Sequence, residues 1–419
     1  MSDEYIDDFA DFTGNSNSSE SSENTQIDEV KNSLTGNFSF RQVGSITTVI
    51  EPVSIEASME LITKAFESDP HVAGIPVEQN GAIIGLLEKK TFESINSSAW
   101  QKFWQKDLDS YISKTDIMLQ ANDFTEKYQQ RVIDENRKTG ISVFPVFMHR
   151  HLLGLVSLHD FLDRVSAIRS QDMEKARIVQ QHLLVDDGCL KTAPFSCVTW
   201  NRMANTVGGD FYKTFCVEKD KKYIIGCFDV SGKNVAAALS TMVIGTFFSA
   251  LKNFTVPVRF GPAITALLDS YVQDATPPGI FTTGALCYID YEKNTISLQN
   301  CGHTPVFVFI PNEQTQKLEM RTLNPNLPPF GMGVIGSSEQ TAMTLPIQKG
   351  IRISMYSDGF TDMQTPEGQR FEDENSKKFF MKSYGKKGDE FLKLVETTVE
   401  EWIEDAMLID DITVMDINF

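Results

Sequence analysis

The sequence lacks three features that would assign its class directly: a long apolar run, a basic excess and closely spaced cysteines. No apolar run reaches the roughly 18 residues needed to cross a bilayer, and the N-terminal segment MSDEYIDDFADF is acidic, unlike a signal peptide. The net charge of −19 disfavours nucleic acid or an anionic membrane as a partner, because both require a basic face. Six cysteines, from Cys189 to Cys301, form no CxxC pair, so we expect reduced thiols. These absences predict a cytoplasmic protein.

The length and composition indicate a globular protein with more than one domain. A chain of 419 residues is too long for one ordinary core, and 41% hydrophobic with 10% aromatic residues is typical of a globular chain. The first 35 residues contain nine acids, one base and the polar patch NSNSSESSENT. Such a segment cannot bury enough apolar surface to order itself. We therefore predict a disordered acidic tail over residues 1–38.

An internal repeat follows the tail. Residues 76–92, PVEQNGAIIGLLEKKTF, align without a gap with residues 145–161, PVFMHRHLLGLVSLHDF, at an offset of 69 positions. Each copy follows a helix-like stretch and has the pattern of two apolar strands, a turn between them and a helix. Such a unit cannot close its own core, so two copies are expected to pack as a pair. The alternative is chance similarity between two strand-turn-strand segments.

The repeat pair resembles a tandem of CBS motifs, a regulatory module that often binds adenine nucleotides between its halves. In that family a Ser or Thr after the second strand, and an Asp three residues later, contact phosphate and ribose. The second copy keeps this pattern as Ser157 and Asp160, whereas the first copy has Glu88 and Thr91. The resemblance implies a CBS-like regulatory domain over residues 39–157. It also implies one nucleotide site at Ser157 and Asp160.

A stretch without Gly or Pro, DFLDRVSAIRSQDMEKARIVQQHLL, follows the repeats. Its apolar residues recur at spacings of three and four if Asp172 is accepted as a polar break, which predicts a long amphipathic helix. We assign residues 158–191 to this connector. The helix can pack on its own domains or pair with a second chain as a short coiled coil, and we predict a homodimer. The stripe consists of Leu158, Phe161, Val165, Ile168, Ala176, Val179 and Leu183.

Residues 192–419 contain many short strands separated by Gly, with two helix-like runs. The expected strands include FTTGALCYIDY, TISLQN, TPVFVFI and IRISMYS, and the helices are VAAALSTMVIGTFFSALKNF and DEFLKLVETTVEEWIEDAM. This pattern predicts an α/β or α+β domain with a large core. In the segment GIRISMYSDGFTD, apolar and polar residues alternate, which predicts a half-buried strand.

Four carboxylates in this domain lie at predicted strand ends, each beside a Gly or a short turn. Asp229 ends the apolar run YIIGCFDV, Asp358 follows IRISMYS, Asp210 opens an aromatic strand and Asp410 precedes ITVMDI. Each alone is a common turn residue. Together they suggest one acidic cluster, which requires cations because like charges at close range repel. Oxygen ligands without Cys or His suit Mg²⁺ or Mn²⁺.

Five motifs in this order resemble the phosphatases of the SpoIIE and RsbU type, within the PP2C-like metal-dependent serine/threonine phosphatase superfamily. They are GGDFY at 208–212, DVSGK at 229–233 with AAL at 237–239, NCGHTP at 300–305, YSDGFTD at 356–362 and DDITV at 410–414. The resemblance implies a β-sandwich flanked by helices over residues 192–419. It also implies two Mn²⁺ or Mg²⁺ ions, bridged by the catalytic Asp229 with the Val230 carbonyl as an auxiliary ligand. Asp210, the catalytic Asp358 and Asp410 complete the coordination, in preference to Asp411.

Several residues near these motifs differ from the family pattern or have an open role. Family members often have an acid where this chain has Lys213, which we expect near the substrate entrance, and a second Gly where it has Asn234. His303 is either a general acid for the leaving group or a structural histidine. Ser231 is expected to be a turn residue. No cysteine-phosphatase loop and no P-loop motif occurs in the sequence.

The sequence thus favours a sensor phosphatase. Its CBS-like pair would bind a ligand, the helix would transmit the occupancy, and the C-terminal domain would dephosphorylate Ser or Thr of a partner protein. In related systems the partner is often an anti-sigma factor antagonist. The alternative is a non-catalytic nucleotide-sensing scaffold that docks a signalling partner. The four matched acids argue against a scaffold, because a scaffold has little reason to gather unpaired carboxylates.

Overall fold

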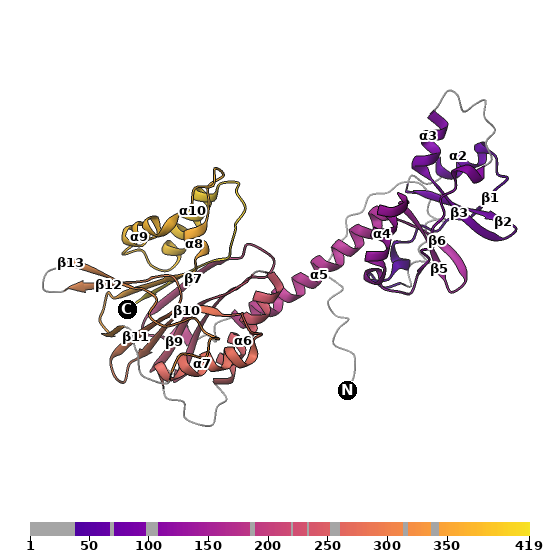
Figure 1. Cartoon of the computed structure of the whole chain (residues 1–419). Coiled ribbons are helices and arrows are strands. Elements are labelled where there is room, and N and C mark those ends of the chain that lie inside the picture. The colour runs from indigo at the N-terminus through magenta and orange to yellow at the C-terminus, as the bar shows by residue number, and fades with distance from the viewer. Residues whose placement is uncertain are drawn as a thin grey trace. The chain divides into compact units, whose positions relative to one another are not determined.

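The computed structural model (Figure 1) describes residues 38–67, 71–97, 108–184, 189–218, 221–232, 234–251, 260–312, 317–336 and 343–419. The chain divides into two compact units, Met1–Gln171 and Asp172–Phe419. Each unit has its own hydrophobic core, and helix α5 (Leu158–Leu184) contributes residues to both. The predicted disordered tail lies outside the described residues except for Phe38.

The N-terminal unit contains two small mixed sheets built from the two copies of the repeat. Each sheet has three strands, with a parallel pair followed by an antiparallel pair. The first copy comprises β1 (Val53–Ser54), α2 (Met59–Glu67), β2 (Gly74–Gln79), β3 (Ala82–Glu88) and α3 (Lys89–Ser97). The second comprises β4 (Leu119–Gln120), α4 (Gln129–Thr139), β5 (Val143–Met148), β6 (His151–Ser157) and the start of α5. Short 3₁₀ helices precede or separate these elements at Val43–Ile46, Leu108–Tyr111 and Thr125–Tyr128.

The two copies share local irregularities as well as strands. A bulge lies between Val77 and Glu78 in the first copy and between Val146 and Phe147 at the aligned place in the second. The turn between the antiparallel strands has a positive φ at Asn80, 52°, and at the aligned His149, 59°. Bulges and left-handed turn residues depend on local sequence and strand register. The 69-residue repeat of the sequence is therefore also a repeat of structure, and chance similarity is ruled out.

The two copies pack on each other through apolar strand residues. Leu86 of β3, Val143 of β5 and Leu155 of β6 form one buried cluster. The segments that precede the copies are exchanged between them, since Thr48 bridges to Leu155 and Ser113 bridges to Leu86. This exchange makes the two copies one folding unit, as the sequence predicted from their incomplete cores.

Helix α5 runs without interruption past Asp172, which confirms the predicted long helix. Its first half belongs to the N-terminal core, where Phe161, Val165 and Ile168 are buried. Its last turns pack on the C-terminal core through Leu183. The segment predicted as a connector is therefore partly core in both units. Leu162, Ile178 and Val179 remain exposed along it.

The C-terminal unit is a sandwich of two five-stranded antiparallel sheets. The first sheet has the order β14-β11-β10-β9-β8 and the second β13-β12-β15-β16-β7. The strands of the first sheet are β8 (Asp210–Glu218), β9 (Lys222–Val230), β10 (Thr282–Asp290), β11 (Thr295–Cys301) and β14 (Met343–Pro346). Those of the second are β7 (Ser196–Arg202), β12 (Val306–Asn312), β13 (Lys317–Leu323), β15 (Arg352–Tyr356) and β16 (Ile412–Asn418).

Helices cover the outer faces of both sheets, which gives four layers (Figure 1). On β9, Tyr223, Ile225 and Cys227 face the opposite sheet, whereas Ile224 and Phe228 face the helices. Both faces of a central strand are then buried, which explains the continuous apolar runs. The helices on the first sheet are α6 (Asn234–Leu251) and α7 (Pro262–Ala275); those beside the second are α8 (Gly359–Asp362), α9 (Glu372–Lys382) and α10 (Asp389–Ile403).

The prediction of a half-buried strand at 351–356 is wrong, because β15 is buried along its whole length. Its polar position Arg352 is only 1% exposed and pairs with Asp416 of β16, which is fully buried, at 2.6 Å. The guanidinium also donates to the Phe380 carbonyl and to Ser383 Oγ next to α9. The alternating pattern thus belongs to a strand that lies between the sandwich core and the helices. The charge on its polar face, Arg352, is neutralised by the buried Asp416.

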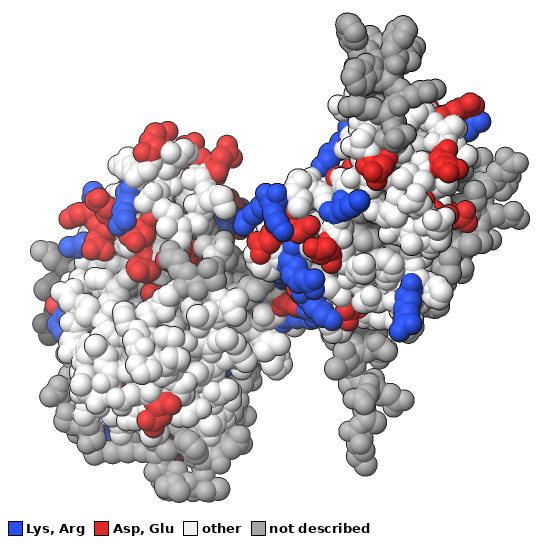
Figure 2. Space-filling view, turned by 45° about the vertical axis from the view of Figure 1, so that its right-hand side comes forward, with Lys and Arg blue, Asp and Glu red and all other residues white. Residues whose placement is uncertain are grey.

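None of the helices in the described ranges combines the length and apolar character needed to cross a membrane. On the face shown in Figure 2, basic side chains lie beside acidic ones and form no separate basic patch.

Candidate active site

The strand ends of the C-terminal unit bring the predicted acids to one region. Asp210 is the first residue of β8 and lies directly opposite Asp229 in the antiparallel register with β9. Asp358 follows β15, and Asp410 lies just before β16, which pairs with β15. Like charges directly opposite each other on a sheet are destabilising unless something neutralises them. The β8–β9 register therefore concentrates negative charge at one end of the first sheet.

Asp210 joins the two sheets at this end. Its Oδ2 accepts hydrogen bonds from Ser357 Oγ at 2.7 Å and from Thr413 Oγ1 at 2.6 Å, both in the second sheet's strand ends. Burial raises the pKa of the Asp210 carboxyl well above its usual value, and the charge of Asp229 raises it further. No Lys or Arg pairs with Asp210 among the described residues. A buried acid beside a second acid is the environment in which a bound cation is stabilising.

Asp411 anchors the loop that leads into β8. Its two carboxylate oxygens accept hydrogen bonds from the backbone N–H of Ala204, at 2.8 Å, and of Gly209, at 2.6 Å. A Cβ at Gly208 would collide with this carboxylate. Because both oxygens are used in this way, Asp411 is poorly placed to bind a metal. The preference for Asp410 as a ligand stays a prediction; its Oδ1 accepts the Asp411 N–H at 3.0 Å.

Two glycines allow the backbone turns around the acids to approach closely. A Cβ at Gly209 would lie 3.1 Å from the Val230 carbonyl oxygen, the predicted auxiliary ligand. A Cβ at Gly359 would collide with the Asp411 carbonyl, so the turn after Asp358 packs directly on the turn of Asp410. The glycines of GGDFY and SDGF are therefore required by packing between distant segments. Asp358 itself is exposed.

Sequence reasoning missed the residue that holds the Gly208 backbone from α5. Gln180 is 2% exposed, and its Nε2 donates to the Gly208 carbonyl at 2.7 Å and to Thr241 Oγ1 at 2.9 Å. Its Oε1 accepts the Gly208 N–H at 3.2 Å. The only sequence signal was a polar residue in the stripe of an amphipathic helix. Gln180 fixes the turn two residues before Asp210.

Lys213, the residue that departs from the family pattern, joins β8 to helix α5. Its side chain is buried, and Nζ donates a hydrogen bond of 2.8 Å to the Leu183 carbonyl in the last turn of α5. A cation near a helix C-terminus complements the exposed carbonyls and the helix dipole. Lys213 therefore fastens α5 to β8. The side chain of Asn234 lies outside the described residues.

His303 has the environment of a structural histidine. Its Nδ1 lies 3.0 Å from Thr283 Oγ1, and its backbone N–H donates to Asn300 Oδ1 at 2.8 Å. Burial lowers the pKa of His303 to about 4, so the ring is neutral near pH 7 and has no proton of suitable acidity for a leaving group. Ser231 Oγ accepts the Phe281 N–H at 2.9 Å, as a turn residue would.

The side chains of the described residues form no group of three or more His, Cys, Asp or Glu that could hold a metal ion as they lie. Asp210 is instead turned towards its two hydroxyl donors. The fit to a divalent ion therefore rests on donor chemistry. Carboxylates and a backbone carbonyl are the oxygen ligands that Mg²⁺ and Mn²⁺ prefer, and the mutual repulsion of Asp210 and Asp229 favours a cation between them.

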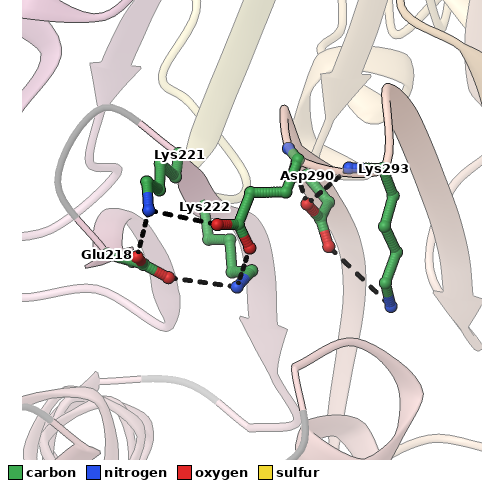
Figure 3. Close-up of polar contacts among 6 residues, drawn as sticks. Glu218, Lys221, Lys222, Asp290 and Lys293 are labelled. Atoms are coloured by element: carbon green, nitrogen blue, oxygen red, sulfur yellow. Dashed lines mark hydrogen bonds and ion pairs between the residues drawn. The ribbon is translucent and has the colours of Figure 1, made fainter.

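The opposite end of the same strands carries a surface ion network without catalytic features (Figure 3). Lys222 Nζ lies 3.0 Å from Glu218 and 2.6 Å from Glu292, and Lys221 contacts the same two carboxylates. These contacts join the β8–β9 turn to the β10–β11 turn. Each acid here has a basic partner, in contrast to Asp210 at the other end.

The N-terminal unit contains the second predicted site. Ser157 and Asp160 line a small cleft together with His71 and Gly74 of the first copy. Ser157 Oγ donates to Asp160 Oδ2 at 2.6 Å and accepts the Asp160 N–H at 3.0 Å. The two side chains thus form one rigid pair at the start of α5.

The matching place in the first copy is closed by Glu88. This side chain is 2% exposed and accepts hydrogen bonds from Ser142 N at 3.1 Å, Ser142 Oγ at 2.6 Å and Ser113 Oγ at 3.3 Å. It also pairs with Lys90 at 3.0 Å. Glu88 therefore links the two copies, and its buried side chain fills the place that corresponds to Ser157 in the second copy.

Comparisons with known proteins agree with the fold and the motifs of the C-terminal unit. The family model described as Stage II sporulation protein E (SpoIIE) matches residues 219–419, a range that contains Asp229, Asp358 and Asp410. Protein IcfG of Synechocystis sp. (strain ATCC 27184 / PCC 6803 / Kazusa) is 24% identical over 69% of this chain and 48% of its own length. The chain thus spans about half the length of this curated relative.

One solved structure shares the fold of the C-terminal unit, and a second was found with a lower score. The SiaA-PP2C domain of Pseudomonas aeruginosa superimposes with a TM-score of 0.50 at 20% identity, covering 61% of this chain and 98% of that chain. The PP2C phosphatase domain of SpoIIE from Bacillus subtilis, with a fragment of its regulatory domain, gives a TM-score of 0.40 at 17% identity, covering 54% and 63%. Residues 219–419 thus match the SpoIIE family model, and the two antiparallel sheets flanked by helices have the fold of the SiaA-PP2C domain.

Proposed function

We propose that this chain is a metal-dependent phosphoprotein phosphatase acting on Ser or Thr. The observation that carries the proposal is the buried Asp210, which lies opposite Asp229 with no basic partner among the described residues. Two Mn²⁺ or Mg²⁺ ions would be held by the side chains of Asp210, Asp229, Asp358 and Asp410 and by the Val230 carbonyl. When bound, such a pair supplies an activated water and neutralises charge on the phosphate.

The residues of this chain have separate tasks in that reaction. Asp229, which lies opposite Asp210, would hold the metal ions together with it, and the exposed Asp358 lies where a phosphoprotein can reach it. Ser357 and Thr413 hold Asp210 in place through its Oδ2. His303 stays neutral and buried, so protonation of the leaving group falls to water.

The proposed regulatory part is the N-terminal repeat pair, a CBS-like module. Its support is the shared strand, bulge and turn pattern of the two copies and the cleft at Ser157 and Asp160. We propose that this cleft binds an adenine nucleotide and that α5, which has residues in both cores, transmits the occupancy. A ligand can shift the output only if it favours one of two arrangements.

We also propose a homodimer that uses the exposed apolar residues of α5. Ile178 and Val179 are about half exposed, at 50% and 51%, and pairing with a second copy would bury them. Light scattering of the full chain at micromolar concentration tests this, and a monomer mass would contradict it.

The proposed substrate is a phosphorylated regulatory protein such as an anti-sigma factor antagonist. The support is the likeness to a family named for a sporulation protein and to a structure described as the RsbU and RsbW domains of a Mycobacterium tuberculosis protein. The competing function is a non-catalytic scaffold that senses a nucleotide and docks a partner. Asp210 favours catalysis, since a scaffold gains nothing from a buried acid placed opposite a second acid.

Hydrolysis of para-nitrophenyl phosphate with and without Mn²⁺ separates the two functions. We expect Mn²⁺-dependent turnover in the wild type and a loss of several orders of magnitude in Asp229→Asn. Glu319→Gln, on the exposed strand β13, is a matched control with the same loss of one charge. Near wild-type hydrolysis by folded Asp229→Asn protein would favour the scaffold.

A further inference from the structure

Arg164, in the second turn of α5, is a half-buried cation with only uncharged partners. Its Nη1 donates to the Phe40 carbonyl at 2.6 Å and to Ser45 Oγ at 2.8 Å, and its guanidinium carbon lies 4.0 Å from the centre of the Phe40 ring. Burial lowers its pKa, and no carboxylate forms an ion pair with it in the described part of the chain. A cation that is held in place without a counter-ion can bind an anionic ligand.

Arg164 lines an open surface groove of about 550 Å³. Ser45, Thr48 and His71 line the groove beside Arg164. Hydroxyl, imidazole and guanidinium groups are the donors that proteins use for phosphate and carboxylate. The groove shares Thr48, His71 and Asp160 with the cleft at Ser157, so one ligand can reach both.

Two acids limit how much negative charge this groove can accept. Asp160 lies on it but is bonded to Ser157 Oγ, and Asp163 lies 3.4 Å from His159 Nε2 on the exposed side of the helix. The groove has one guanidinium and two carboxylates. The guanidinium can pair with a single phosphate, whereas the carboxylates would repel the additional phosphates of a triphosphate. The groove therefore suits a singly phosphorylated ligand.

The first copy of the repeat has no equivalent cation. The position aligned with Arg164, 69 residues earlier, is Ile95, and the adjoining cleft position is filled by Glu88. The anion site therefore belongs to the second copy only.

We propose that Arg164 is the phosphate-binding residue of the N-terminal ligand site, and that the ligand is a nucleoside monophosphate with its phosphate in this groove. The proposal rests on the proposed function, which places an adenine nucleotide at Ser157 and Asp160. It adds the residue that binds the phosphate and the number of phosphates.

Calorimetry with adenosine, AMP and ATP on the full chain tests this directly. We expect AMP to bind the wild type at least about tenfold more tightly than adenosine and more tightly than ATP. In Arg164→Met the advantage of AMP over adenosine should vanish while adenosine affinity stays, and Arg164→Lys should keep part of it. Arg169→Met is the matched control, because Arg169 is exposed on the same helix and bonds only Gln129 among described residues.

The outcomes separate this inference from the proposed function. Equal affinities for AMP and adenosine in the wild type, an unchanged ratio in Arg164→Met, or tighter binding of ATP would overturn the monophosphate site and leave nucleotide binding intact. If neither adenosine nor AMP binds, the nucleotide assignment fails. Inorganic phosphate then decides: a rise in melting temperature that is reduced in Arg164→Lys and lost in Arg164→Met supports the anion site, and no rise, or an equal rise in Arg164→Met, overturns it. If Arg164→Met does not fold, the AMP-to-adenosine ratio of Arg164→Lys decides in its place.

Discussion

Replacement of Gln180 by Leu should loosen the turn that precedes Asp210. The substitution keeps the size of a buried side chain but removes two hydrogen bonds to Gly208 and one to Thr241. Gly208 is buried, so its N–H and C=O lose their partner, at about 1–3 kcal/mol for each unsatisfied group. Burial of the added apolar surface offsets part of this. We expect a net local destabilisation of about 2–4 kcal/mol.

Hydrogen exchange of peptides covering residues 204–210 measures this local free energy. A loss of about 2–4 kcal/mol corresponds to roughly 30-fold to 1000-fold faster exchange, since about 1.4 kcal/mol is tenfold. Because Gly208 lies two residues before Asp210, the Mn²⁺ concentration for half-maximal hydrolysis should also rise. Gln181→Leu is the control, as this neighbouring side chain is exposed. Exchange and Mn²⁺ dependence equal in the two variants would refute the role of Gln180.

Three further changes test the structural reasoning. Glu88→Ala should destabilise the N-terminal unit by about 2–4 kcal/mol in denaturant unfolding, since Ser142 and Ser113 lose a buried acceptor, and the exposed Glu93→Ala should not. Arg352→Met should lower the free energy of unfolding by about 3–5 kcal/mol, because Asp416 stays buried without its basic partner. Adding Asp416→Asn should restore part of this loss, and a double variant no more stable than Arg352→Met would contradict the reasoning. Because burial lowers the pKa of His303 to about 4 from 6.5, its neutral form contributes stability above pH 6.5 that is lost as pH falls towards 4. Between pH 6.5 and 4 the wild type should therefore lose up to about 3 kcal/mol of unfolding free energy relative to His303→Gln. A difference between the two proteins that does not change with pH would show that the ring does not titrate as described.

The sequence determined the features that depend on local pattern. The hairpin strands of the two repeat copies have equal lengths at an offset of 69 residues, because the apolar strand segments and the turn at Asn80 and His149 set each hairpin by itself. The acids at Asp210, Asp229, Asp358 and Asp410 were found at strand ends for the same reason, since glycines and turns mark where a strand stops.

Only the tertiary structure decided which distant residues form hydrogen bonds with these acids. Asp210 is held by Ser357 and Thr413, which are 147 and 203 positions away, and no local pattern marks such partners. Arg352 was expected to face solvent and is buried, because α9 and α10 cover a face that the strand's own sequence presents as polar.

The same limit applies to Gln180, Lys213, Glu88 and Arg164. Each is an ordinary polar residue in the sequence, and each has its role because packing brings it to a backbone group, a hydroxyl or a groove from another segment. Hydrophobic periodicity specifies which face of an element is buried. The partner of a polar side chain is specified by the register and packing of whole elements, which the chain fixes only when it folds.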